Sequence, residues 1–352
     1  MNIDMAALKA LEKQEGVPFD ELVYGIKRGL LEAYRSISGH TGPARVDIDE
    51  SSGQVTVYQI EKDDQGEIIG SLEDTPSDFG RAGAAAVREA VTFRVRSSRA
   101  QADYDRYSDL RYTVVNGVVT RDARANERGV TVVHLGTELD GLDGQILPAE
   151  LIPGEKPEHG DRIRAFVTDV ILSGNRSVQI NMSRTHPELV RGLFALEVPE
   201  IADGSVEIVA VAREAGHRTK IAVTSSIKGL NAKGACIGPR GQRVAAIMEQ
   251  LNGEKIDIVD YSDDPAVYVG NALAPSKVVS VVVTDAELQV ARAVVPDYQL
   301  SLAIGREGQN ARLAARLTGW KIDIHSDAAV ANKPVVEVGD ASGTQESAET
   351  DA

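Results

Sequence analysis

The sequence predicts a multidomain α+β protein, and three observations lead to that fold class. The front of the chain combines helical periodicity with short alternating segments, the middle changes to short strands separated by glycines, and the last third carries one short motif twice. At 352 residues the chain is long enough for two to four domains, each with a hydrophobic core. We therefore expect an α/β N-terminal domain, a small β-barrel and a pair of similar modules.

The front domain, expected over residues 1–107, has helices that each carry an apolar stripe. In the second helix the stripe repeats every four residues from Leu22 to Tyr34. A basic series from Arg88 to Arg106 lies on a long third helix; a solvated face is the expected reading, and contact with an acidic protein surface is the alternative. The expected elements are helices at Met5–Glu15 and Phe19–Tyr34, strands at Arg45–Ile48 and Gln54–Ile60, and a long helix from about Gly80 to Tyr107.

Residues 108–183 show short strands separated by glycine turns. Five strands of this size predict an OB-type barrel, a fold that often binds single strands by stacking bases on aromatic side chains. Few aromatic side chains are available for stacking, chiefly Tyr107, Tyr112, His134 and Phe166, so we expect weak RNA contact by the barrel. The expected strands are Arg111–Val119, Val130–Leu135, Leu142–Leu147, Arg162–Ile171 and Val178–Met182.

The repeated motif is I-G-x-x-G-Q, at Ile237–Gln242 and again at Ile304–Gln309, an offset of 305 − 238 = 67 residues. In each copy an apolar stretch leads into the motif, a helical pattern leaves it, and a strand-like K-I-D-I follows at Lys255–Ile258 and Lys321–Ile324. Helix, G-x-x-G loop, helix and strand is the arrangement of a KH domain, which clamps the backbone of about four single-stranded nucleotides. We expect two tandem KH domains.

Glycines at the ends of each loop let the chain turn sharply and let a phosphate approach backbone N–H groups at positive helix ends. Arg240 and Arg306 place a guanidinium in each loop, where forked donors suit phosphate oxygens. Glu307 opposes phosphate binding in the second loop because its carboxylate repels the anion. A helical hairpin that turns on glycine and binds nothing is the alternative for either copy alone. The following helices open with donors that would face base edges, namely Gln242, Arg243, Gln309 and Asn310.

The charge balance limits how this chain would hold RNA. The formal net charge is −15, which repels nucleic acid at long range, so binding must come from local placement of Arg and Lys. From Arg184 to Asp327 the sequence has 16 basic and 18 acidic residues, so the paired modules are the least acidic region. The single Cys236 suits a reducing cytoplasm and, between apolar neighbours, is expected to be a buried core residue.

No cofactor or metal site is predicted, because the six histidines are scattered and no ligand spacing emerges. Asp257, Asp260, Asp263 and Asp264 are spaced acids after a strand, which favours a solvated turn over a metal site. No G-x-x-x-x-G-K-[ST] loop is present, which disfavours an NTPase, and we expect no enzymatic activity. No apolar run approaches membrane-spanning length, and no signal-peptide core opens the chain, so a cytoplasmic protein is expected.

With the runs G-A-C-I-G-P-R-G-Q-R and S-L-A-I-G-R-E-G-Q-N-A-R-L-A-A-R-L-T-G-W, the sequence resembles the NusA family of bacterial transcription elongation and termination factors. The likeness spans nearly the whole chain. It implies an S1-type barrel, a monomer docked on RNA polymerase through the front domain, and modules that contact nascent RNA during pausing, termination or antitermination with other factors. The RNA contacts it implies are Gly238, Pro239, Arg240, Gly241, Gln242 and Arg243 in the first module, and Gly305, Arg306, Glu307, Gly308, Gln309, Asn310, Arg312 and Arg316 in the second.

A ribosome-associated or RNA-processing protein with S1 and KH domains is the alternative function, since it would use the same modules. Some members of the family continue into acidic helical repeats, and functions of those repeats are not expected of this chain. The acidic composition after Asp327 predicts a short disordered tail. The expected boundaries are 1–107 for the polymerase-binding domain, 108–183 for the barrel, 184–260 and 261–328 for the KH domains, and 329–352 for the tail.

Overall fold

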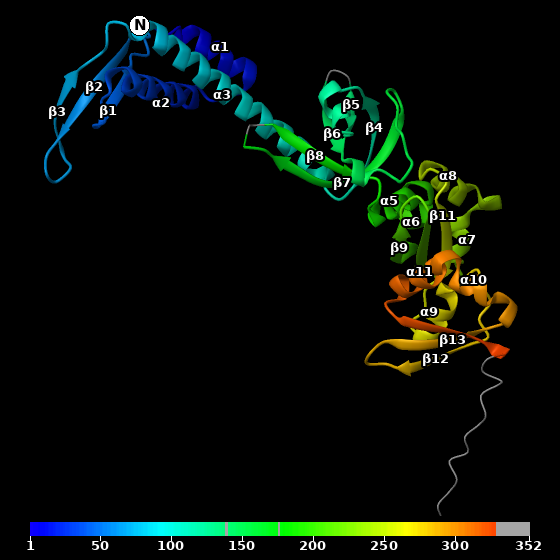
Figure 1. Cartoon of the computed structure of the whole chain (residues 1–352). Coiled ribbons are helices and arrows are strands. Elements are labelled where there is room, and N and C mark those ends of the chain that lie inside the picture. Colours follow the sequence, from blue (N-terminus) through cyan, green and yellow to red (C-terminus); the bar gives the residue numbers. More distant parts are fainter. Residues whose placement is uncertain (138–139, 175–176, 329–352) are drawn as a thin grey trace, which may run out of the picture. The chain divides into compact units, whose positions relative to one another are not determined.

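The computed structural model describes residues 1–137, 140–174 and 177–328 (Figure 1). The chain forms two compact units, one made of residues 1–148 and 157–183, the other of residues 149–156 and the chain from Arg184. The short segment 149–156 belongs to the second unit because Glu150 accepts a hydrogen bond from the Arg184 backbone N–H at 2.8 Å. The predicted disordered tail lies outside the described residues.

The front part of the first unit combines helices with a sheet, as the sequence predicts, and the sheet is antiparallel with three strands. Gly16 and Gly39 end the first two helices in the left-handed conformation, which glycine adopts without a Cβ clash. The third strand was not predicted. The elements are α1 (Met5–Glu15), α2 (Phe19–Ser38), β1 (Ala44–Ile48), β2 (Val55–Lys62), β3 (Ile68–Glu73) and α3 (Phe79–Tyr107), and the sheet order is β1-β2-β3.

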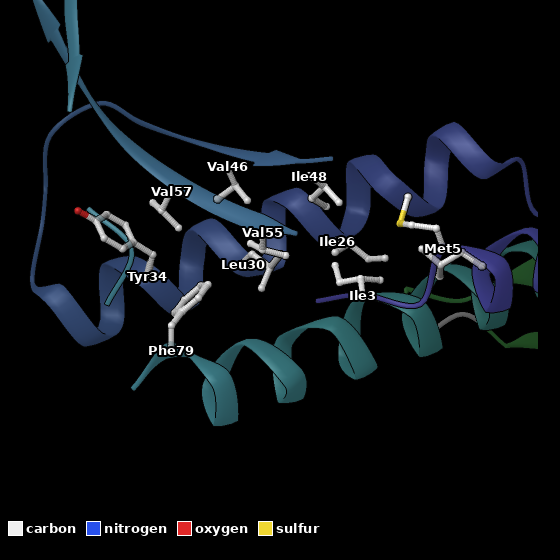
Figure 2. Close-up of a cluster of buried hydrophobic side chains, with 11 residues drawn as sticks. Ile3, Met5, Ile26, Leu30, Tyr34, Val46, Ile48, Val55, Val57 and Phe79 are labelled. Atoms are coloured by element: carbon white, nitrogen blue, oxygen red, sulfur yellow. The ribbon is translucent and has the colours of Figure 1, made fainter. Parts of the chain in front are cut away.

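The core of this domain lies between the sheet and the helices (Figure 2). Leu30 and Tyr34 on α2 are fully buried, and so are Val57 on β2 and Phe79 at the start of α3. The apolar stripe predicted for the second helix therefore faces the sheet. The Tyr34 hydroxyl donates to Asp74 at 2.6 Å, so the one polar atom of this buried ring has a partner.

The rest of the first unit is a closed five-stranded barrel, which confirms the predicted OB-type fold. Glycines make room where strands cross: a Cβ on Gly117 would lie 2.5 Å from Val133 Cγ1, and one on Gly144 would lie 2.6 Å from Met182 Cε. The elements are the 3₁₀ turn η1 (Ser108–Leu110), β4 (Val114–Thr120), α4 (Ala123–Glu127), β5 (Thr131–Thr137), β6 (Asp140–Ile146), β7 (Arg162–Leu172) and β8 (Val178–Ser183), and the barrel order is β4-β5-β6-β8-β7.

The second unit contains one topology twice, which confirms the repeat. In each module two strands form an antiparallel hairpin, and a third strand pairs in parallel with the second strand of that hairpin. Two helices joined by the G-x-x-G loop precede the third strand. Besides the turn η2 (Pro148–Glu150), the first module has α5 (Pro187–Glu197), α6 (Pro199–Ala202), β9 (Val206–Glu214), β10 (Arg218–Ser225), α7 (Ala232–Ile237), η3 (Pro239–Gly241), α8 (Gln242–Gln250) and β11 (Lys255–Asp260). The second has α9 (Pro265–Ala272), β12 (Ser280–Asp285), β13 (Val290–Val295), η4 (Asp297–Gln299), α10 (Leu300–Ile304), η5 (Arg306–Gly308), α11 (Gln309–Thr318) and β14 (Lys321–Ser326).

The two modules share one apolar cluster. Leu313, Ala314 and Leu317 on α11 pack with Ala212 of β9 and Ala222 of β10, all of them buried. Helix α11 of the second module therefore lies on the sheet of the first. Among the described residues, no helix has the length and apolar character that crossing a bilayer requires.

Candidate RNA-binding site

The two G-x-x-G loops have nearly the same backbone. Gly238 has φ 73° and ψ 174°, and its counterpart Gly305 has φ 78° and ψ 170°. Arg240 and Glu307 adopt left-handed conformations, at φ 52° and 54°. In both loops the closing glycine N–H donates to the opening glycine carbonyl at 3.1 Å. The repeated sequence thus fixes a repeated turn.

The first glycine of each loop is required by its conformation. A φ near 75° combined with a ψ near 170° is open essentially to glycine alone. A Cβ on Gly238 would lie 2.6 Å from Arg243 Cγ, and one on Gly305 would lie 2.8 Å from the backbone N of Asn310. The closing glycines, Gly241 and Gly308, are left-handed but have open space around the position of a Cβ. The entrance of each loop, at Gly238 or Gly305, is therefore tightly packed, and the rest of the loop up to the closing glycine, called the tip below, is open.

The tips of both loops are accessible to a ligand. Pro239 and Arg240 are exposed in the first loop. In the second, the side chains of Arg306 and Glu307 are 93% and 84% exposed, and their charged groups lie 3.8 Å apart. Such a distant, solvated ion pair adds little stability, so Arg306 can turn toward a phosphate. An anion that reaches the tip meets a guanidinium in each module.

Arg243, which opens α8, is held inside the first module. Its Nη1 donates to Glu200 Oε2 at 2.9 Å and to the Ala235 carbonyl at 2.7 Å. These bonds draw the side chain under Gly238 and fix the turn from α7 into α8. Gln242, in contrast, is exposed.

Asn310 takes the corresponding place under Gly305 and is 1% exposed. Its Nδ2 donates to the carbonyls of Ala303 and Leu273, at 2.9 and 3.1 Å. The side chain thus joins the second loop to the end of α9, and burial keeps it from a ligand in this conformation.

Three further residues predicted for the second module, Gln309, Arg312 and Arg316, meet at one carboxylate of the first module. Glu214, at the end of β9, accepts from Arg312 Nε at 2.6 Å and from Gln309 Nε2 at 2.9 Å. Arg316 Nη1 lies 3.6 Å from the same carboxylate. The hydrogen bond from Arg312 lowers the pKa of Glu214 below its usual value. Sequence reasoning did not identify Glu214.

A buried ion pair supports the end of β9 in the first module. Arg213 and Glu254 are 1% and 0% exposed, and Arg213 Nη2 donates to Glu254 Oε2 at 2.9 Å. Glu254 also accepts from the Gly216 N–H and the Thr219 hydroxyl, which satisfies the buried carboxylate. The neighbouring Glu214 is therefore carried on a firmly bonded strand.

The four acids singled out from the sequence lie in β11 and in the turn after it, and Asp257, Asp263 and Asp264 have side-chain partners. Asp257 accepts from Arg218 Nε at 2.7 Å and from Lys220 Nζ at 2.9 Å, Asp263 accepts from the Tyr261 hydroxyl, and Asp264 caps α9 by accepting from the Ala266 N–H. Within the part of the chain that the structure describes, no group of three His, Cys, Asp or Glu residues is arranged to hold a metal ion.

The barrel presents few aromatic side chains to solvent. Of the four named from the sequence, Tyr107 and Phe166 are core residues, 7% and 4% exposed, while Tyr112 is 71% exposed. The His134 ring bonds to Asp143 at 2.7 Å through Nδ1. Tyr112 is thus the most accessible of the four for stacking on a base.

Two family models match the tandem modules: the NusA-like first KH domain matches residues 184–261 and the NusA-like second KH domain matches residues 265–332. The transcription termination/antitermination protein NusA of Mycobacterium tuberculosis strain H37Rv is 57% identical over 328 residues, covering 93% of this chain and 94% of that protein. The chain belongs to the NusA family.

More distant members of the NusA family match over a similar share of the chain. The Bacillus subtilis protein of the same name is 41% identical over 346 residues, which cover 91% of this chain and 90% of that protein. A solution structure of the N-terminal domain of NUSA from B. subtilis is 27% identical and covers 27% of this chain and 94% of that chain, at a TM-score of 0.23.

Proposed function

We propose that this NusA-family protein is an RNA-binding transcription factor that docks on RNA polymerase through its front domain and receives the emerging single-stranded transcript on its two KH modules. In this role it modulates pausing, termination and, with other elongation or antitermination factors, antitermination. The role is non-catalytic and takes place in the cytoplasm. The observation that carries the proposal is the pair of G-x-x-G loops with matching backbone angles and exposed tips in one packed unit.

The loops supply the RNA contact in this proposal. Each exposes an arginine at its tip and backbone N–H groups at the start of a helix, which is the chemistry that holds phosphates. Gly238 to Gln242 in the first loop and Gly305 to Gly308 in the second remain the candidate contacts. Arg243, Gln309, Asn310 and Arg312 hold the loops in place through hydrogen bonds. Arg316, whose side chain is 56% exposed and lies 3.6 Å from Glu214, can turn toward RNA.

The front domain supplies the protein contact. A groove of about 560 Å³ runs between α2 and α3, lined by small residues including Gly29 and Ala86, with Phe93 43% exposed and Arg94 at its border. An apolar groove with charged borders fits a protein segment better than a polyanion. Attachment to polymerase would raise the local concentration of transcript at loops that bind RNA weakly.

The test is transcription in vitro across a hairpin-dependent pause. A fragment that starts at Asp103 is expected to bind RNA nearly as well as the full chain, which also shows that it is folded, but to lose the effect on pausing and termination. If the fragment prolongs the pause as well as the full chain at equal, sub-saturating concentration, the docking role fails. Co-sedimentation of the front domain with ribosomes, and none with transcribing polymerase, would favour the ribosomal alternative.

A further inference from the structure

Glu214 connects the two modules at the RNA site. It is the last residue of β9 in the first module, and its side chain is 18% exposed. The carboxylate accepts two bonds from Arg312, at 2.6 Å from Nε and 3.2 Å from Nη2, and one from the Gln309 amide at 2.9 Å. Gln309 and Arg312 lie on the first turn of α11, directly after the second G-x-x-G loop. One carboxylate thus holds the exit of that loop from the neighbouring module.

The contact continues into the loop itself. Arg312 Nη1 donates to the backbone carbonyl of Glu307 at 3.2 Å. Glu307 is the left-handed residue at the tip of the second loop, with φ 54°. Glu214, Arg312 and the Glu307 carbonyl therefore form a chain of hydrogen bonds from β9 to the second loop tip. The bond to an ionised carboxylate is of the stronger, charge-assisted kind.

The first loop has no such connection to the other module among the described residues. The position equivalent to Arg312 is 312 − 67 = 245, which is Ala245. The arginine beneath the first loop, Arg243, bonds to Glu200 and Ala235 of its own module. In addition to the packing of α11 on the sheet of the first module, side-chain bonds that have no counterpart in the first loop thus hold the second loop in position.

We propose that Glu214 is a positioning residue that holds the second loop in register with the first module, so that one single-stranded RNA contacts both loops at once. This inference rests on the proposed function. Two binding sites held at a fixed separation gain affinity for a ligand that spans them and none for a ligand that reaches only one. Glu214 therefore acts on long RNA and not on short RNA.

Simple electrostatics makes the opposite prediction, which gives the test a decisive sign. Removing Glu214 takes away a negative charge near the loops and frees Arg312 for phosphate, so every RNA would bind more tightly. Loss of register instead weakens binding of RNA long enough to reach both loops. The direction of the change, and its dependence on RNA length, separate the two outcomes.

The experiment uses the full chain with Glu214→Ala, the shortened carboxylate Glu214→Asp, and Glu200→Ala as the matched change in the first module. The probes are labelled unstructured RNAs of about four and about twelve nucleotides, one loop's length and enough for both. Anisotropy measures the affinity of the long RNA, NMR titration that of the short RNA, and thermal denaturation shows that each variant is folded.

Glu214→Ala is expected to weaken binding of the long RNA about fivefold to tenfold and to leave that of the short RNA unchanged. Glu214→Asp should restore most of the loss, and Glu200→Ala should not reproduce the length dependence. Unchanged or tighter binding of the long RNA by a folded Glu214→Ala variant overturns the inference, as does an equal loss for both RNAs. If the unaltered chain binds neither RNA, the proposed function itself fails, and this inference with it.

Discussion

In the first G-x-x-G loop the side chain beneath the opening glycine is Arg243, bonded to Glu200 of the same module; in the second it is the buried Asn310, and the helix that follows bonds across to Glu214. The backbone angles of the two loops agree within a few degrees. Glycine placement therefore determines the turn, and the surrounding side chains determine what the turn is attached to. The first loop is anchored within its module, and the second is anchored to its neighbour.

A second contrast between the modules occurs in their sheets. Lys220 pairs with Asp257 between parallel strands in the first module, and Arg292 pairs with Asp323 at the equivalent register in the second. Lys220 is fully buried and also donates to the Ala274 carbonyl at 2.5 Å, whereas the Asp323 side chain is 53% exposed. The first pair belongs to the junction of the modules, and the second lies on the surface.

Asp257→Ala is expected to have the largest effect on stability, about 4 kcal/mol, because it leaves the Lys220 ammonium buried without its carboxylate. Burial favours the neutral form of Asp257, but bonds from Arg218 and Lys220 outweigh it and hold the pKa of Asp257 below its usual value. The matched change Asp323→Ala should cost under about 1 kcal/mol. Urea denaturation measures both. Similar costs would contradict the contrast between a buried and a surface pair.

Alanine at the opening glycines tests how rigidly each loop is anchored. Gly305→Ala should cost about 3 kcal/mol, since the backbone conformation excludes a Cβ and the new methyl meets the backbone N of Asn310. Gly238→Ala meets the Arg243 side chain, which is displaced more readily than backbone, so the cost should be about 2 kcal/mol. Thermal denaturation of both variants gives the difference. We thus expect the entrance of the second loop to be the more rigid. A greater loss of stability for Gly238→Ala than for Gly305→Ala would contradict this.

Aspartate at both closing glycines tests the RNA contact. Gly241→Asp with Gly308→Asp puts a negative charge at each open tip, where nothing lies within 4 Å of a Cβ, so RNA affinity should fall about tenfold or more. The left-handed conformation should cost about 1 kcal/mol of stability at each site. Anisotropy with a labelled single-stranded RNA measures binding, and circular dichroism the fold. Unchanged affinity in the double variant would remove the loops from the RNA site.

The smallest effect is expected at Cys236, whose equivalent at 236 + 67 = 303 is Ala303; both are 0% exposed. Cys236→Ala makes the first module resemble the second and should cost about 1 kcal/mol. Burial raises the pKa of the Cys236 thiol to about 11, so alkylation of the native protein at pH 8 should be slow. Rapid labelling by iodoacetamide would show that the helix before the first loop opens readily.

In the front domain and the barrel, most of the elements followed from periodicity, whereas the hairpin that opens each sheet of the tandem modules was not predicted. The helix Met5–Glu15 agrees with the prediction, and the long third helix begins one residue earlier than expected, at Phe79. Strand β3 was missed because it has no buried alternation: Ile68, Ile69 and Leu72 are each more than 60% exposed. A pattern method finds a strand by the face it buries, and this edge strand buries almost none.

The loops of the candidate site could be found from sequence because a doubled glycine motif is local. The side-chain contacts that hold these loops in place could not be found in this way. Glu214 lies 98 residues before Arg312, and nothing in the local sequence of β9 distinguishes it from a solvated glutamate at a strand end. The buried state of Asn310 likewise depends on the Leu273 carbonyl, 37 residues away. Side-chain partners set by tertiary packing are outside the reach of periodicity.

The carboxylate at the end of β9 has a consequence for how the two modules evolve. Positions 214, 309 and 312 are chemically interdependent, so a relative that replaces the acid would be expected to replace the donors too. A chimera that joins this first module to a second module from another family member would therefore keep these bonds only if that second module carries the same donors at the positions equivalent to 309 and 312. The unit that can be exchanged intact is the tandem pair.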